Sequence, residues 1–282
     1  MKHADTEQLE VDLLLEAIYR CYGYDFRSYA RSSIERRIAQ FLATSHCASV
    51  SELIPKVIHD HSFFSELAHC FSIPVTELFR DPEVYRVVRE KVVPLLKTWP
   101  HVKIWHAGCA TGEEVYSLAI VLKEEGVYDR ATIYATDLNG QAIEQAREGV
   151  YEMGKIQDAT RNYQQAGGQG AFSQYYHARY GAVAMDPAFR ERIVFSTHNL
   201  ATDSVFGEMH LIFCRNVLIY FNRELQNHVL ELFAESLVHG GFLCLGTKED
   251  IRFTAASAHY GAFDRKARIY RRAAGAEDGV KR

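Results

Sequence analysis

The sequence lacks any apolar run long enough to cross a membrane, since none of its segments approaches the roughly 18–20 residues that such a helix needs. Residues 1–10 are polar and acidic, whereas a secretory signal has an apolar centre. We therefore expect a cytoplasmic protein that does not insert into a membrane.

Closely spaced cysteines are also missing, because the 6 cysteines form no C-x-x-C pair and are spread evenly along the chain. Disulfide frameworks and structural zinc sites usually need such pairs. We expect reduced thiols and no bound metal.

The chain has no excess of positive charge: 32 Lys and Arg stand against 36 Asp and Glu, for a net charge of −4. Proteins that bind nucleic acid are normally basic, so no nucleic-acid partner is expected. The Asn/Asp-Pro-Pro-aromatic motif of enzymes that methylate amino groups of bases is absent as well. What is present is 48% apolar residues over 282 positions, which suits one large or two modest domains.

The spacing of apolar residues changes near Pro100. Before this point the spacing is helical throughout. Ser32 and Glu35 form a capping box, which predicts that a helix begins near Ser33. Further helices are expected at 50–60, 61–71 and 83–96.

After Pro100, short apolar strands alternate with helices, which indicates an α/β fold: a parallel sheet with helices on both faces. Residues 268–272 are a candidate edge strand, and 164–170 a flexible loop. The aromatic-rich segment 172–192 fits neither period and predicts a small strand-rich insertion. The expected strands are 102–107, 132–136, 193–196, 210–214 and 241–245, and the expected helices are 113–124, 141–147 and 223–238.

A glycine loop, Ala-Gly-Cys-Ala-Thr-Gly at 107–112, joins the first strand to its helix. Gly108 and Gly112 let the backbone turn sharply and approach a ligand, as in dinucleotide sites, although a tight turn without a ligand would look the same. Asp137 ends the next strand, where a carboxylate can accept two hydrogen bonds from a ribose. It could instead cap the following helix.

The identity of the ligand depends on the residues around this loop. Ala110 replaces a glycine of the G-x-G-x-x-G fingerprint, and Glu113 and Glu114 open the helix. Two carboxylates do not suit a helix N-terminus that cradles pyrophosphate. S-adenosylmethionine carries a sulfonium, an amino group and no phosphate, so the loop favours it over NAD.

Two further strands end in polar residues. Arg215 and Asn216 follow the fourth strand, at the edge where open parallel sheets bind ligands. The alternative is a polar strand exit that caps the next helix. Asn199 follows the third strand and is a similar candidate, with a role in a turn as its alternative.

Taken together, these segments resemble the CheR-type chemoreceptor glutamate methyltransferases. The resemblance covers about residues 10–272 and implies a class I, Rossmann-like methyltransferase domain after a helical domain, with a small inserted β-subdomain. It is carried by residues 71–81, 107–117, 135–137, 198–200 and 213–221.

The resemblance implies a division of the chain into a receptor-docking helical domain, a linker helix, a methyltransferase domain with an insertion at about 172–192, and a flexible tail. The predicted boundaries are 1–85, 86–100, 101–274 and 275–282.

The resemblance also implies S-adenosylmethionine as cofactor and S-adenosylhomocysteine as product. Gly108 and Glu113 are added as candidates, because helix phase alone does not decide between Glu113 and Glu114. Pro74 stands where the family often has Asn, and it offers neither an amide side chain nor an N–H. The implied cofactor contacts are Thr76, Arg80, Glu114, Asp137, Asn199, Leu200, Asn216 and Val217.

The implied reaction is methyl transfer to glutamate side chains of a chemoreceptor cytoplasmic domain, which makes the chain a protein-glutamate O-methyltransferase. A free Glu has a pKa of about 4.3, so the acceptor is already an anion and needs neither a base nor a metal. Arg80 and Tyr220 are the candidate catalytic residues. Arg80 could instead pair with Asp81 or Glu83, and Tyr220 could close the core.

Arg31, Arg36 and Arg37 form a predicted docking surface for an acidic helical receptor, with a solvated helix face as the alternative. The stretch 176–183 is short and holds one glycine, so we expect a protein that does not depend on a pentapeptide tether. We also expect a monomer. Four other functions stay open: methylation of nucleic acid, methylation of another signalling protein, NAD-dependent oxidoreduction, and a non-catalytic module that binds S-adenosylmethionine.

Overall fold

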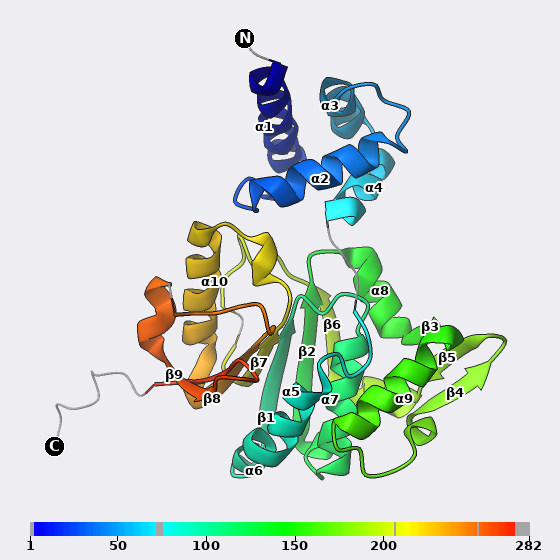
Figure 1. Cartoon of the computed structure of the whole chain (residues 1–282), viewed down its shortest axis with the longest axis vertical. Coiled ribbons are helices and arrows are strands. Elements are labelled where there is room, and N and C mark those ends of the chain that lie inside the picture. Colours follow the sequence, from blue (N-terminus) through cyan, green and yellow to red (C-terminus); the bar gives the residue numbers. More distant parts are fainter. Residues whose placement is uncertain (1–2, 72–75, 206, 253, 274–282) are drawn as a thin grey trace.

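The computed structural model describes residues 3–71, 76–205, 207–252 and 254–273 (Figure 1). A bundle of four helices stands above an α/β domain. The bundle has its own apolar core, to which every one of its helices contributes. Its helices are α1 (His3–Tyr22), α2 (Arg31–Leu42), α3 (Val50–His59) and α4 (His61–Phe71).

The predicted capping box is wrong. Helix α2 begins at Arg31, and Ala30 stands at the N-cap position without a side-chain cap. Glu35 accepts a hydrogen bond from Nε of Arg31 at 2.7 Å instead, one turn away. Residues four positions apart lie on the same face of a helix, so the Glu35 carboxylate pairs with Arg31 and does not reach back to a backbone N–H.

The predicted helix at 83–96 is confirmed, with one irregular turn. It consists of α5 (Pro82–Val87), a π turn (Val88–Val92) and α6 (Val93–Leu96). Pro94 follows the π turn and has no N–H to donate to the preceding turn. The wider turn is the usual way to accommodate such a break.

The central sheet has the strand order β6-β2-β1-β7-β8-β10-β9. The first five strands are parallel, and β10 runs antiparallel to both neighbours. The α/β expectation is confirmed, but 268–272 is not an edge strand, because the unpredicted β9 covers it. The strands are β1 (Val102–Ala107), β2 (Ala131–Asp137), β6 (Ile193–Thr197), β7 (Met209–Cys214), β8 (Leu237–Leu245), β9 (Tyr260–Asp264) and β10 (Ile269–Arg272).

Helices cover both faces of the sheet, so it separates two apolar cores. Neighbouring residues of β1 point to opposite faces: Ile104 belongs to one core and Trp105 to the other. Helix α9 was missed, although Ile156, Ala159 and Tyr163 recur at helical spacing and are buried. The helices of this domain are α7 (Glu113–Glu124), α8 (Gly140–Glu148), α9 (Ile156–Gln165) and α10 (Arg223–Ser236).

A second, three-stranded sheet projects from the α/β domain (Figure 1). It has the order β3-β5-β4, with β3 (Val150–Glu152), β4 (Tyr176–Arg179) and β5 (Ala182–Met185). Two of its strands lie in the segment predicted to be strand-rich, and β3 comes from outside it. Tyr180 and Gly181 join β4 to β5 with φ angles of 52° and 76°, as a two-residue hairpin turn requires. The domain boundaries proposed from the sequence stay predictions.

Within the described ranges, no helix is both long and apolar enough to span a membrane.

Candidate cofactor and catalytic site

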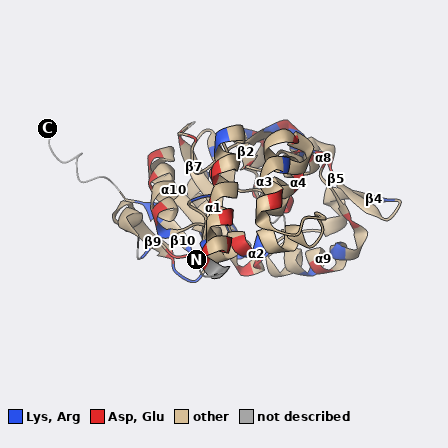
Figure 2. Ribbon diagram, turned by 90° about the horizontal axis from the view of Figure 1, so that it is seen from above, with Lys and Arg blue, Asp and Glu red and all other residues tan. Residues whose placement is uncertain are grey.

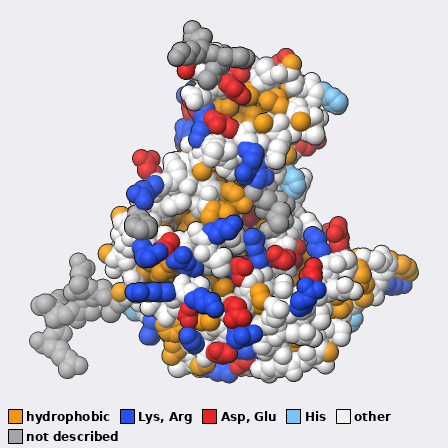
Figure 3. All heavy atoms as spheres, in the orientation of Figure 1, with side chains coloured by type: hydrophobic (Ala, Val, Ile, Leu, Met, Phe, Trp, Pro, Cys, Tyr) orange, Lys and Arg blue, Asp and Glu red, His pale blue; other side chains and the backbone are white. Residues whose placement is uncertain are grey.

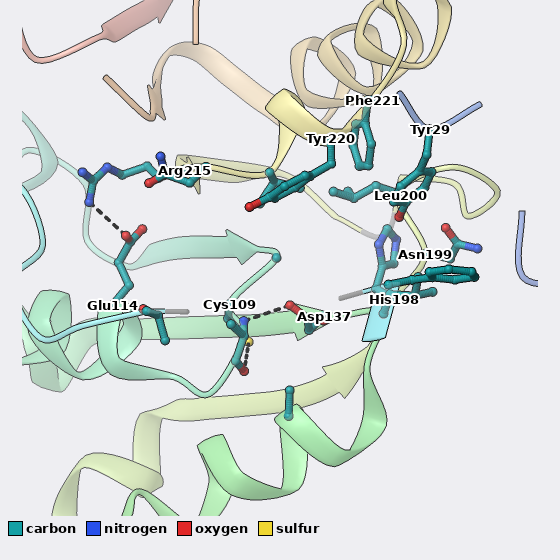
Figure 4. Close-up of a pocket in the computed structure, with 18 of the residues that line it drawn as sticks. Tyr29, Cys109, Glu114, Asp137, His198, Asn199, Leu200, Arg215, Tyr220 and Phe221 are labelled. Carbon is teal, nitrogen blue, oxygen red and sulfur yellow. Dashed lines mark hydrogen bonds and ion pairs between the residues drawn. The ribbon is translucent and has the colours of Figure 1, made fainter. Parts of the chain in front are cut away.

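A pocket opens where the carboxyl ends of β1, β2 and β7 meet the helical bundle (Figure 4). It encloses about 1040 Å³, part of which is open to solvent. Predicted cofactor and catalytic residues line it together: Thr76, Arg80, Gly108, Glu114, Asp137, Asn199, Leu200, Asn216, Val217 and Tyr220.

The glycine loop is held tightly against its surroundings. Gly108 and Gly112 have φ angles of 78° and 90°. A Cβ atom on Gly108 would lie 2.5 Å from Cγ2 of Val217, and one on Gly112 would lie 2.8 Å from Cβ of Ala146. Larger residues would push the loop off both neighbours, so both glycines are needed by this geometry.

Asp137 is fixed by the loop it faces. Its Oδ2 accepts a hydrogen bond from the N–H of Ala110 at 2.8 Å, and its Oδ1 accepts one from the N–H of Asn139 at 2.9 Å. Burial raises the pKa of Asp137, and these N–H groups oppose that rise. Asp137 is not the cap of α8, because the side chain of Asn139 accepts the N–H groups of Gln141 and Ala142.

Arg215 organises the opposite side of the pocket. Its guanidinium is fully buried and donates to Oε2 of Glu114 at 2.9 Å (Figure 4). The guanidinium also donates to Oδ2 of Asp81 at 2.6 Å. It also donates to the carbonyl oxygen of Arg80 at 3.1 Å. Asp81 thus pairs with Arg215, and Glu83 pairs with Arg86.

The charges around Glu114 act in opposite directions. Burial raises the pKa of Glu114, whereas the positive charges of Arg215 and Arg80 lower it. Burial lowers the pKa of the neighbouring His106 to about 3, with a contribution from Arg215, so that this imidazole is neutral. The sequence marked Arg215 only as half of a polar pair, and nothing in its spacing indicated that it joins three segments.

The structure does not bring Glu113 to the pocket. Its side chain is buried and accepts a hydrogen bond from Oγ1 of Thr111 at 2.7 Å. Burial raises the pKa of Glu113 to about 7. Successive helical residues point about 100° apart, so only one of the two acids can face the ligand side.

The helical bundle supplies one wall of the pocket, which the sequence did not indicate. Phe26, Tyr29 and Phe71 line it from this side. The bundle attaches through backbone hydrogen bonds, from the Ala30 N–H to the carbonyl oxygen of Tyr220 at 2.7 Å and from the Asn222 N–H to that of Ser28 at 2.9 Å. The docking therefore places aromatic rings opposite the sheet.

The three predicted docking arginines all lie on α2 but differ in their surroundings. Arg31 is half-buried and pairs with Asp12 and Glu35. Arg37 is half-buried and donates to the carbonyl oxygen of Cys70 at 3.2 Å. Arg36 is exposed. Figure 2 shows that acidic and basic residues both occur along the helices of the bundle.

The polar groups of the pocket fit an adenosyl ligand with an amino acid end. Oδ1 of Asn216 is buried and has no hydrogen-bond partner within the described part of the chain, so it can accept from a ligand. Asp137 offers a carboxylate to a diol, and Glu114 offers one to an ammonium group. Pro74 lies outside the described residues, so its effect on the site is not described.

Two family models cover most of the chain. The CheR methyltransferase all-alpha domain matches residues 9–72, and the CheR methyltransferase SAM binding domain matches residues 74–263. The chain belongs to the CheR methyltransferase family. It is therefore a methyltransferase with a class I fold, and S-adenosylmethionine is its cofactor.

Related CheR proteins align over most of their length. A Pseudomonas putida protein named Cher3 is 50% identical over 264 residues, which is 94% of this chain and 97% of the relative. A chemotaxis protein methyltransferase of Listeria innocua is 30% identical, over 86% of this chain and 91% of its own. Chemotaxis protein methyltransferase 1 of Pseudomonas aeruginosa is 28% identical, over 77% of this chain and 81% of its own.

Proposed function

We propose that this CheR-family protein methylates glutamate side chains in the cytoplasmic domain of a methyl-accepting chemoreceptor, and forms glutamyl methyl esters. The convergence of the motif-matched residues in one pocket is the observation that carries the proposal. The names of the Listeria and Pseudomonas aeruginosa relatives support chemotaxis as the pathway.

The proposed cofactor contacts follow the charges of the pocket. Asp137 binds the ribose hydroxyls, and Asn216 accepts a hydrogen bond through its buried Oδ1. Glu114 attracts the ammonium group of the methionine part, and Arg80 attracts its carboxylate or that of the acceptor. The rings of Tyr29 and Phe221, whose centres lie 4.9 Å apart, offer apolar surface for a base.

The chemical step does not require the protein to transfer a proton. S-adenosylmethionine supplies a methyl group on a sulfonium, and the acceptor glutamate is already ionised at neutral pH. The residues of the chain therefore act by orientation and by excluding water. Arg80 and Tyr220 hold the acceptor carboxylate in line.

The acceptor glutamate is an anion on an acidic partner, so a basic surface on this protein would attract it. Figure 3 shows basic side chains on the face where the bundle meets the α/β domain. Arg36 is exposed on this bundle and is the docking residue that the structure supports best. Such charges mainly steer the encounter and are screened by salt.

The test is transfer of a tritiated methyl group from S-adenosylmethionine to purified receptor cytoplasmic domains. Label that base releases as methanol is the expected result, because only an ester is hydrolysed in this way. Base-stable label would indicate another acceptor atom. Binding of S-adenosylhomocysteine without any transfer would favour a non-catalytic signalling module.

A further inference from the structure

Glu249 is a buried carboxylate that accepts hydrogen bonds from backbone N–H groups. It is 4% exposed and lies just after β8. Its Oε2 accepts from the N–H of Gly246 at 2.6 Å and from that of Asn216 at 3.1 Å. Its Oε1 accepts from the N–H of Ile219 at 3.3 Å.

These hydrogen bonds fall on the segment that carries two proposed site residues. Asn216 and Tyr220 both line the pocket. The N–H groups that donate to Glu249 belong to residues 216 and 219, within the turn that carries these two side chains. Asn216 has a φ of 62°, a left-handed conformation that costs free energy outside glycine. A fixed acceptor for its N–H offsets this cost.

The absence of a side chain at Gly246 leaves space for the carboxylate of Glu249. A Cβ atom on Gly246 would lie 2.8 Å from Oε2 of Glu249 and 2.8 Å from the backbone N of Asn216. Burial raises the pKa of Glu249, and the surrounding N–H groups oppose that rise. Both carboxylate oxygens therefore serve as acceptors for backbone donors.

We propose that Glu249 is a positioning residue, which holds the 216–220 turn so that Asn216 faces the cofactor and Tyr220 faces the acceptor. It touches neither ligand and acts through the backbone. The proposal rests on the proposed function, because it takes Asn216 to be a cofactor contact.

The Glu249→Gln variant tests this role, because glutamine keeps the size but sets an amide NH₂ against backbone donors. We expect its dissociation constant for S-adenosylhomocysteine, measured by calorimetry, to rise at least tenfold. We also expect faster amide hydrogen exchange at 216 and 219. Asp250→Asn is the matched control, since the neighbouring Asp250 pairs with the outward-lying Arg252 and Arg268, and it should bind as the wild type does.

Two further variants separate the possible failures. Gly246→Ala keeps the carboxylate but crowds both Glu249 and the backbone N of Asn216, so it disturbs the contact between them. It serves if Glu249→Gln does not fold, and it too should weaken binding. Asn216→Ala tests the contact itself. Weak binding by Asn216→Ala with unchanged binding by both other variants would overturn the positioning role. Unchanged binding by Asn216→Ala would overturn the proposed contact instead.

Discussion

At the scale of single residues, Glu113 and Glu114 show how position decides the use of a side chain. Glu114 lies at the pocket beside Arg215, which stabilises its charge. Glu113 is turned into the protein, and its nearest hydrogen-bond donor is the neutral hydroxyl of Thr111. Burial penalises the charged form of Glu113 more than Thr111 and the charge of Lys155 stabilise it, so its pKa rises to about 7.

This difference predicts a pH effect on stability. The pKa of Glu113 is about 7 in the folded state against 4.5 for the free side chain, so the folded state binds more protons between these values. The free energy of unfolding should therefore fall as pH rises from 5 to 8, by on the order of 3 kcal/mol from this residue. In Glu113→Gln the free energy of unfolding, measured with denaturant, should depend less on pH. The exposed control Glu144→Gln should show the same pH dependence as the wild type. Parallel curves for Glu113→Gln and the wild type would refute this.

Arg80 carries the most direct prediction for activity. Arg80→Ala should reduce turnover on the order of 10²-fold or more, as expected for loss of a charged donor at a reacting centre. Arg86→Ala is the matched control, since Arg86 lies on α5, pairs with Glu83 and does not line the pocket. Circular dichroism would verify that both fold. Wild-type turnover in folded Arg80→Ala would remove Arg80 from the site.

Asp137 carries the corresponding prediction for binding. S-adenosylhomocysteine should bind in a one-to-one ratio, and Asp137→Ala should lose two charge-assisted hydrogen bonds, each worth about 1.5–3 kcal/mol. Calorimetry should show a loss of affinity of about a hundredfold or more, and exposed Asp129→Ala should show none. An unchanged affinity for Asp137→Ala would exclude the ribose contact.

At the scale of elements, the sequence predicted the parts of the site that follow strand ends. Asp137 and Asn216 come at the carboxyl ends of β2 and β7, and a parallel sheet brings such ends together. The wall formed by Tyr29 was not predictable in this way. It depends on backbone hydrogen bonds between 28–30 and 220–222, which leave no pattern in the side chains.

The same reasoning explains why the role of Arg215 was missed. Its position after a strand marked a polar site, but its partners Asp81 and Glu114 lie more than 100 residues away in sequence. Long-range pairing of one buried arginine with two acids is a result of packing, and no local spacing encodes it. Glu249 was missed for a related reason, since its partners are backbone groups.

Helix α2 allows a test that separates stability from docking. Arg31→Ala removes pairs with Asp12 and Glu35, so it should lower the free energy of unfolding by about 1 kcal/mol. Arg36→Ala changes an exposed residue, so it should leave stability within about 0.5 kcal/mol and raise the KM for the receptor at low salt. Equal receptor kinetics for Arg36→Ala and the wild type at low salt would exclude Arg36 from docking.

At the scale of the whole molecule, the helical bundle and the α/β domain share one site. The bundle's rings line the pocket, and its backbone is bonded to the turn that carries Tyr220. Receptor docking on α2 would therefore take place on the same unit that closes the pocket. Under the proposed docking, recognition and catalysis would involve the same helical unit.

The small sheet bears on how the receptor is held. Its β4 edge has no strand partner among the described residues, so a peptide could add a strand there. Specific capture also needs pockets for alternate side chains. The residues 177–179 of β4 are exposed, Tyr180 is 89% exposed, and the two-residue turn provides no loop to fold over a peptide.

We therefore predict that this enzyme does not depend on a pentapeptide tether at the receptor's C-terminal end. Without a tether the effective concentration of the receptor is lost, so its affinity should be weak and should fall steeply with salt. Deleting the receptor tail should leave the methylation rate unchanged, and calorimetry with a tail peptide should detect no binding. Micromolar binding that maps to 172–192, or loss of methylation on tail deletion, would show that the open β4 edge is used after all.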